Sequence, residues 1–455
     1  SSLAIQWVQG EMERMEREGP NIEIDYRTEL SDEDEANIVR SSTAGFGEFV
    51  LSLLGKIFTL LENLPELSRA RSGSPEESVI NTLPSALTPL FAALSPEIFD
   101  QALEKIATFV GGHVIHQSRD AMAFICNSLC KANPEKTLKI FVPMLIVGIR
   151  NEIDYNDAAS DRSSGSDVLP RDRALVWHIS MLSMIIVHVG DSLMPYKKDL
   201  FDIALYMQEK CRGIPTIHIS NYIHHLLLNL TLIYPVDGAL YEPDVFKRGL
   251  DVSDWGKITK PTDLTINWHL PSDEEIKFAV ELFESQVDTA MQRLTNLISE
   301  NPAVSRKGKN KEWSDEVSRN LSQLRLIVSG IATLFDPKKA SGQLDKDQDD
   351  DTQMSGNDSS DEEESPLAEA AEDVETRPQF HYRAGYLLER DSPTYVHIHE
   401  LRENIGELLS RLHVFLSEFQ EDDVACFTAL YQTYRTWITD VGNERSAHML
   451  ERVSK

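Results

Sequence analysis

Two helix starts of the same design, 38 residues apart, constrain the fold of this chain more than any other feature. They are Ser95-Pro96-Glu97-Ile98 and Asn133-Pro134-Glu135-Lys136. In each, a Ser or Asn side chain can cap the first turn, and proline fills the first helical position, where no hydrogen bond is lost. Glutamate then lies against the positive end of the helix dipole. Both sequences therefore predict the first turn of a helix.

Two apolar patterns of helical period lie between these starts, on either side of Gly111-Gly112. The first runs from Phe99 to Val110 and the second from Met122 to Leu129, with apolar residues three or four positions apart. Helix pairs that recur about every 40 residues stack into solenoids, which are typically binding scaffolds. The prediction is an all-α, HEAT/armadillo-like helical-repeat solenoid with a disordered acidic insertion.

Composition and periodicity divide the chain into six segments. Ser272-Asp273-Glu274-Glu275 is a capping box that begins a long helical hairpin. Residues 151–171 and 337–378 bury too little apolar surface to order themselves, so we expect them to be mobile and dispensable for folding. The segments are an N-terminal helical segment with charged loops (1–94), HEAT-like helix pairs with an acidic, serine-containing loop at 151–171 (95–235), an irregular connector suited to a short hairpin (236–271), a long helical hairpin (272–336), a disordered acidic linker (337–378) and C-terminal helices (379–455).

The charge of the chain limits its partners. Its net charge is −30 and its pI is near 4.8, which disfavours nucleic acid and anionic membrane surfaces, because both require clustered Lys and Arg. Residues 345–376 hold 14 Asp and Glu against one Lys. Ser359 and Ser360 directly precede four acidic residues, the pattern of acidophilic kinase substrates, so both are candidate phosphorylation sites. The tract is interpreted as a phosphorylation switch, as a bait for basic histone-like tails, or as a solvated spacer.

Cysteine usage and apolar stretches indicate a soluble protein from a reducing compartment. Four cysteines in 455 residues are too few for a disulfide framework. Cys126 and Cys130 lie one helical turn apart with no base nearby, so they are interpreted as structural. The apolar stretches 176–189 and 217–234 are interrupted by histidines and Asn229 and predict buried helices rather than membrane spans. We expect this chain to be an interior piece of a longer protein.

Three histidine-containing sequences invite a functional interpretation. His397-Ile398-His399-Glu400 and His113-Val114-Ile115-His116 suggest metal ligands, but neither supplies the three or four ligands of a metal site. We therefore interpret them as polar residues at helix starts and interfaces. His224 and His225 are consecutive on a helix, so their rings point in different directions and at least one should lie in an interface. No catalytic, cofactor-binding or metal-binding residue is predicted, and the chain is not expected to be an enzyme.

Four pieces of sequence, once the helix pairs are laid out, resemble the middle region of the large ATP-independent HEAT-repeat proteasome activators. The resemblance spans residues 95–417 and rests on the pieces as an ensemble. The acidic insertion suggests a fungal-type member. The pieces are Ala132-Asn133-Pro134-Glu135-Lys136-Thr137-Leu138 followed by Phe141-Val142-Pro143, then Trp268-His269-Leu270-Pro271-Ser272-Asp273-Glu274-Glu275-Ile276 leading into Glu281-Leu282-Phe283-Glu284, then Tyr382-Arg383-Ala384-Gly385-Tyr386, and His399-Glu400-Leu401-Arg402 with Ile405-Gly406.

The resemblance implies a function. Members of this family wrap a solenoid into a dome over the end ring of the core proteasome and admit peptides and unfolded or acetylated proteins, including histones, without ATP or ubiquitin. They are associated with the nucleus, the cytoplasm and DNA repair. They dock through a C-terminal hydrophobic–Tyr–X tail, which is absent from this chain because it ends Arg452-Val453-Ser454-Lys455. Members also bind inositol phosphates, but no residue here can be assigned to such a site.

Periodicity alone leaves a second class of function open. A generic helical-repeat adaptor, such as a transport receptor or a signalling scaffold, has the same repeating apolar stripes. A hydrolase ranks last, because the chain contains no phosphate-binding glycine loop, nucleophile elbow or zinc-protease motif. The resemblance alone favours the proteasome activator.

Overall fold

The described part of the chain is almost entirely helical. The computed structural model describes residues 45–64, 75–161, 167–235, 268–299, 307–331, 334, 392–419 and 424–439. Within these ranges the only strands are β1 (Tyr234–Pro235) and β2 (Trp268–His269), which form one short antiparallel pair. The all-α prediction is therefore confirmed, whereas the predicted acidic linker and its candidate sites Ser359 and Ser360 lie outside the described residues.

The chain divides into two compact units, and the first comprises residues 1–66 and 94–113. Its described helices are α3 (Phe46–Glu62) and α5 (Pro96–Gly112), which pack against each other. The rings of Phe58 and Phe109 stack with centroids 4.0 Å apart at the centre of this contact. The helix–turn–helix pairing of 96–112 with the next helix along the chain stays a prediction, because the two helices belong to different units.

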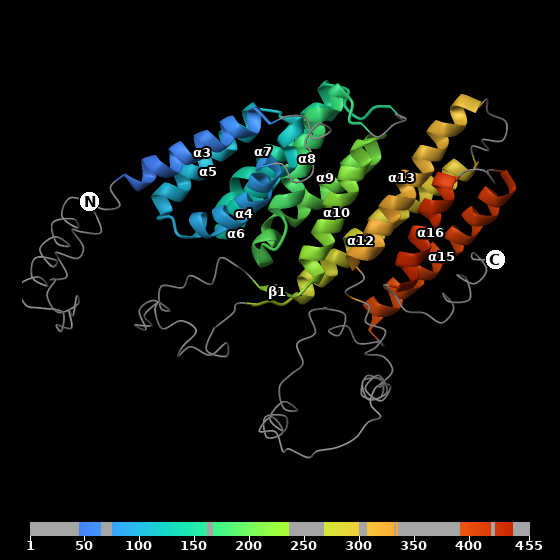
Figure 1. Ribbon diagram of the computed structural model, residues 1–455. Coiled ribbons are helices and arrows are strands. Elements are labelled where there is room, and N and C mark those ends of the chain that lie inside the picture. Colours follow the sequence, from blue (N-terminus) through green and yellow to red (C-terminus); the bar gives the residue numbers. More distant parts are fainter. Residues whose placement is uncertain are drawn as a thin grey trace, which may run out of the picture. The chain divides into compact units, whose positions relative to one another are not determined.

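The second unit comprises residues 67–93 and 114–455, and its helices form two layers (Figure 1). The chain alternates between the layers after α6, so successive helices form antiparallel hairpins that stack side by side. Short 3₁₀ helices η1 (His116–Ser118), η2 (Pro170–Asp172) and η3 (Gly190–Tyr196) lie in the connections. The first layer contains α4 (Pro75–Ala92), α6 (Arg119–Ala132), α8 (Arg173–Ile185), α10 (Pro215–Thr231), α13 (Lys307–Ile331) and α16 (Val424–Thr439). The second layer contains α7 (Pro134–Tyr155), α9 (Lys197–Lys210), α12 (Asp273–Ser299) and α15 (Pro393–Phe419).

The predicted helix starts are confirmed by their hydrogen bonds. Ser95 Oγ accepts a hydrogen bond from the Ile98 amide at 3.4 Å, and Asn133 Oδ1 accepts one from the Lys136 amide at 3.1 Å. At the start of α12 the Ser272 amide donates to Glu275 Oε2 at 2.9 Å. The Glu275 amide donates back to Ser272 Oγ at 3.3 Å, which completes the capping box.

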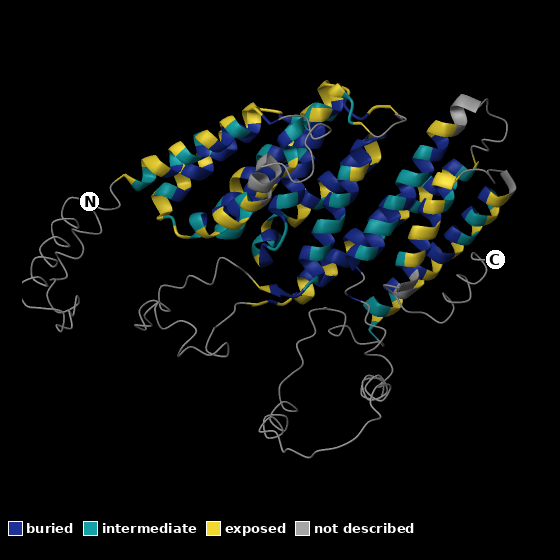
Figure 2. Ribbon diagram, viewed as in Figure 1, coloured by how far each residue is buried: buried dark blue, intermediate teal, exposed yellow. Residues whose placement is uncertain are grey.

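The helices at the middle of the stack are covered on several sides, as their continuous apolar sequences predicted. Nine of the 13 residues of α8 are buried, among them Trp177, and α10 shows the same pattern (Figure 2). Each of these helices packs on two neighbours in its own layer and on at least one helix of the other layer. Burial on this scale supplies most of the stability of a helix that has polar residues in its sequence.

The loop expected at 151–171 is shorter than predicted and partly anchored. Helix α7 passes through Pro143 and continues to Tyr155. Ala158 and Ala159 are buried, and the Ala159 amide donates to Asp172 Oδ1 at 2.8 Å. The residues around Ala159 are thus held by Asp172, which directly follows the predicted loop, and the expectation that the loop is mobile and dispensable for folding stays a prediction.

Two glycines allow helices of the second unit to approach closely. A Cβ atom at Gly330 of α13 would lie 2.9 Å from Leu227 Cβ of α10, and one at Gly406 of α15 would lie 2.6 Å from Trp437 Cζ2 of α16. Separations below 3 Å are not tolerated without movement, so only glycine fits these two contacts.

Candidate functional site

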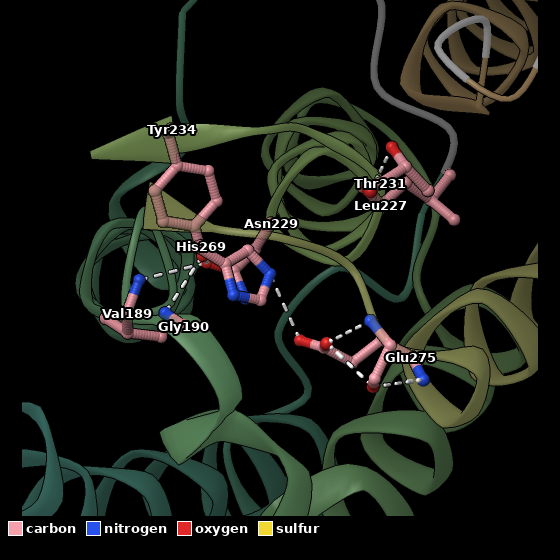
Figure 3. A network of polar contacts seen from close by, with 9 residues as sticks. Val189, Gly190, Leu227, Asn229, Thr231, Tyr234, His269 and Glu275 are labelled. Atoms are coloured by element: carbon pink, nitrogen blue, oxygen red, sulfur yellow. Dashed lines mark hydrogen bonds and ion pairs between the residues drawn. The ribbon is translucent and has the colours of Figure 1, made fainter. Parts of the chain in front are cut away.

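A buried polar cluster joins three helices of the second unit, and we call it the polar joint (Figure 3). It lies where α8 leads into η3, where α10 ends and where α12 begins. Buried polar groups are costly unless they are paired, so a cluster of this kind fixes one arrangement of the elements that contribute to it. The polar joint consists of the backbone amides of Val189 and Gly190 and the side chains of Asn229, Tyr234, His269 and Glu275.

The two strands bring Tyr234 opposite His269 in the polar joint. The antiparallel register pairs Tyr234 with His269 and Pro235 with Trp268. The Tyr234 ring contacts the His269 ring with centroids 4.7 Å apart and stacks on His188 at 4.5 Å. The end of α10 and the start of α12 are thereby fixed next to each other.

Asn229 and Tyr234 satisfy the backbone at the start of η3. Asn229 Oδ1 accepts hydrogen bonds from the Val189 amide at 3.0 Å and from the Tyr234 hydroxyl at 2.8 Å. The Tyr234 hydroxyl in turn accepts one from the Gly190 amide at 2.9 Å. Gly190 has φ of 63°, a left-handed conformation that glycine adopts without strain. Burial raises the pKa of Tyr234, so its hydroxyl keeps the proton that it donates to Asn229.

A contact between the buried His269 and Glu275 side chains completes the polar joint. His269 Nε2 lies 3.3 Å from Glu275 Oε1, and the two side chains are 6% and 1% exposed. Burial alone would raise the pKa of Glu275, but His269 and the Ser272 amide and hydroxyl lower it below its usual value. The carboxylate therefore stays ionised and holds His269 against the start of α12.

His224 and His225 connect α10 to both of its neighbours in the first layer. His224 Nδ1 lies 2.9 Å from the Leu326 carbonyl oxygen of α13, whereas His225 Nδ1 lies 2.8 Å from Ser183 Oγ of α8. The prediction that the two rings point in different directions is confirmed, and both rings lie in interfaces. Burial lowers the pKa of His225, which keeps the ring neutral.

The histidines suggested as metal ligands have other partners. His113, in the first unit, stacks on Phe109 and lies 3.7 Å from Glu62. His397 of α15 lies 3.2 Å from Glu284 of α12. Within the described ranges no group of three or more His, Cys, Asp or Glu is arranged to hold a metal ion. His116 lies in η1 of the second unit, and the side chain of His399 is outside the description.

The four cysteines are buried and free, as their positions in apolar helices predicted. The thiol of Cys130 donates to the Ile185 carbonyl oxygen at 3.0 Å, and that of Cys126 contacts Met181 Sδ at 3.8 Å. Burial raises the pKa of both thiols, which suppresses the thiolate that nucleophilic chemistry needs. Both residues pack α6 against α8.

Sequence reasoning missed the polar joint as a unit. Asn229 was noted only as an interruption of an apolar stretch, and Tyr234 carries no local signal at all. Val189 lies 40 residues from its partner Asn229, and His269 lies 35 residues from its partner Tyr234. A buried Asn in an otherwise apolar helix is the one clue, because such a residue requires hydrogen-bond partners.

The stacked hairpins and their polar joint define a HEAT-type helical-repeat scaffold. None of the helices in the described ranges combines the length and apolar character needed to cross a bilayer. The sequence model of the family described as "Proteasome activator complex subunit 4, mid HEAT repeats region" matches residues 1–335. The chain therefore belongs to this family, and its resemblance to the HEAT-repeat proteasome activators is confirmed.

Individual relatives agree with this family. "Proteasome activator complex subunit 4" of Bos taurus is 30% identical over 318 residues, which cover 66% of this chain and 16% of the relative. The protein of the same name from Xenopus laevis is 29% identical over 311 residues, covering 65% of this chain and 16% of the relative. "Proteasome activator BLM10" of Saccharomyces cerevisiae is 22% identical over 392 residues, which cover 67% of this chain and 18% of the relative. The chain thus spans about a sixth of the length of the curated relatives it matches.

Proposed function

We propose that this chain is an interior scaffold segment of a proteasome activator that caps the core proteasome. The observation that carries the proposal is the match of residues 1–335 to the middle HEAT-repeat region of proteasome activator complex subunit 4. Relatives named as proteasome activators, from yeast to vertebrates, support it. The generic adaptor ranks below it, because it accounts for the repeats but not for these relatives.

The role of the segment is mechanical. A repeat scaffold transmits its shape through contacts between neighbouring hairpins, and here α10 is held by His224 and His225 on two sides and by the polar joint at its end. We infer that this rigidity keeps one section of the activator wall in a fixed curvature. The chain would then be a regulatory part and not an enzyme, in keeping with buried, protonated thiols.

The finer features of the activity follow from the family and are part of the proposal. The parent protein would bind the end ring of the core proteasome and promote degradation of peptides and of unfolded or acetylated proteins, including histones, without ATP or ubiquitin. It would act in the nucleus and cytoplasm, including in DNA repair, without contacting nucleic acid or membranes directly. Inositol phosphates would be its only small-molecule ligands, at residues that we do not assign.

The test uses the full-length parent protein, tagged and purified from its own cells. Under the proposal, the core proteasome co-purifies with it, and the complex hydrolyses fluorogenic peptides faster than the core proteasome alone. The substitution Tyr234→Phe removes one hydroxyl from the polar joint and should reduce this stimulation while the protein remains folded. Tyr155→Phe, which removes an exposed hydroxyl at the end of α7, is the matched control. Recovery of transport factors in place of the core proteasome would refute the proposal in favour of the adaptor.

A further inference from the structure

Charge is distributed unequally between the two layers of the second unit. The six helices of the first layer together carry nine Lys and Arg against six Asp and Glu. The four helices of the second layer together carry sixteen Asp and Glu against ten Lys and Arg. The first layer is therefore locally positive in a chain whose net charge is −30. Such segregation is a physical signature of a surface that attracts negative charge.

A pocket opens on this positive layer across three consecutive helices. Its volume is about 320 Å³, and it is lined by residues of α6, α8 and α10. Polar donors and acceptors face it together with apolar side chains. The residues that matter here are Arg119 and Phe124 of α6, Ser180 and Met184 of α8, and His218 and Asn221 of α10.

Arg119 is the one Lys or Arg among the residues that line the pocket. Its side chain is 16% exposed, and its Nε and Nη2 both lie 2.9 Å from Asp120 Oδ1 at the rim. Burial and the charge of Arg119 lower the pKa of His218 to about 4. Burial, Arg119 and Arg173 likewise lower the pKa of His116. Burial is the largest cause of the lowered pKa of both rings, Arg119 adds to it, and the Asp120 carboxylate acts in the opposite direction.

Further arginines lie on the helices that follow the pocket in the first layer. His224 of α10 contacts the Leu326 carbonyl oxygen of α13, next to Arg325. Arg325 Nη1 donates to Gln432 Oε1 of α16 at 3.2 Å, at an exposed position. Arg435 follows on the exposed side of α16. Cationic side chains therefore occur on every first-layer helix from α6 to α16 except α10, which contributes histidines.

We propose that this face binds an acidic polypeptide segment of a partner protein, with the α6–α8–α10 pocket receiving one of its carboxylate side chains. The positive charge of the face favours an acidic partner. The residues that line the pocket favour a peptide over a polyphosphate. A polyphosphate needs several converging cations, whereas the pocket offers one arginine, already shared with Asp120, and neutral histidines. Phe124 and Met184 provide an apolar wall for the stem of a Glu side chain. Asn221 and Ser180 add hydrogen-bonding groups of the kind that fix a peptide in place.

The experiment measures binding of a fluorescein-labelled twelve-residue Glu-rich peptide to the whole chain by fluorescence anisotropy. The expected result is binding that weakens as salt is raised and that is lost with a peptide in which Gln replaces Glu. Arg119→Gln and Arg325→Gln should each weaken binding about threefold, as expected for partly exposed ion pairs. Arg411→Gln, an exposed arginine of α15 in the other layer, should leave binding unchanged.

A gain of affinity provides the second arm. Asp120→Asn removes the carboxylate that competes for Arg119, so binding of the Glu-rich peptide should tighten about threefold. A misfolded variant cannot produce this result. Equal binding of the Gln peptide, equal weakening by Arg411→Gln, or no gain with Asp120→Asn would overturn the proposal. Tighter binding of a single-stranded DNA oligonucleotide of the same length would also overturn it, because the face would then be a nucleic-acid surface.

Discussion

Acidification should destabilise the packing of α6, α8 and α10 through His218. Burial and Arg119 lower the pKa of this ring from about 6.5 to about 4, with His116 acting in the same direction and Asp120 opposing it. The folded chain therefore keeps His218 neutral between pH 6.5 and 4, while the unfolded chain takes up a proton there. The free energy of unfolding is therefore undiminished by this group above pH 6.5 and decreases as the pH falls below 6.5. At pH 5 the loss is about 2 kcal/mol for this one residue.

The assay is urea unfolding followed by circular dichroism at pH 7.5 and pH 5.0. The wild-type chain should lose about 2 kcal/mol more free energy of unfolding between these pH values than His218→Gln, which cannot titrate. Asn221→Ala changes the same pocket without removing a titratable group, so its pH dependence should match that of the wild type. Equal losses in wild type and His218→Gln would refute the reasoning, because the proton uptake would then lie elsewhere.

Two other substitutions test the packing of the second unit. Glu275→Gln leaves buried His269 without its charged partner and should lower the free energy of unfolding by about 3 kcal/mol; a loss below about 1 kcal/mol in urea titrations would contradict a fixed buried pair. Gly406→Ala forces a methyl group to within 2.6 Å of Trp437 and should cost about 2 kcal/mol. A Cβ atom at Gly55 would have no neighbouring atom within 4 Å, so Gly55→Ala should instead raise the melting temperature, since alanine favours the helix. Equal effects of the two substitutions would show that crowding is not the cause of the loss at Gly406.

Local features of the fold were predictable from the sequence because short-range physics decides them. The starts of α5, α7 and α12 depend on capping groups within four residues of one another, and all three occur where predicted. The buried character of α8 and α10 follows from apolar residues around most of their circumference. These properties require no knowledge of which helix is the neighbour.

The partners of the helices were not predictable, because they depend on residues far apart in sequence. Periodicity does not indicate that α5 packs on α3, because residues 63–95 separate the two helices in sequence. The pair of two-residue strands that fixes Tyr234 beside His269 has no β pattern long enough to recognise. Likewise, the polar sequence after Asn151 predicts a loop there, whereas α7 continues to Tyr155. Beyond this helix, the buried side chain of Asp172 accepts a hydrogen bond from the Ala159 amide, a contact between residues 13 positions apart.

The consecutive histidines of α10 have a consequence for how this array comes apart. A helix that rotates away from one neighbour normally keeps its contacts with the other, so repeat arrays unravel from their ends by one hairpin at a time. Rotation of α10 would pull His224 from Leu326 and His225 from Ser183 in the same movement. Loss of order at α10 should therefore spread to α8 and α13 together, which makes the centre of this segment a single cooperative block.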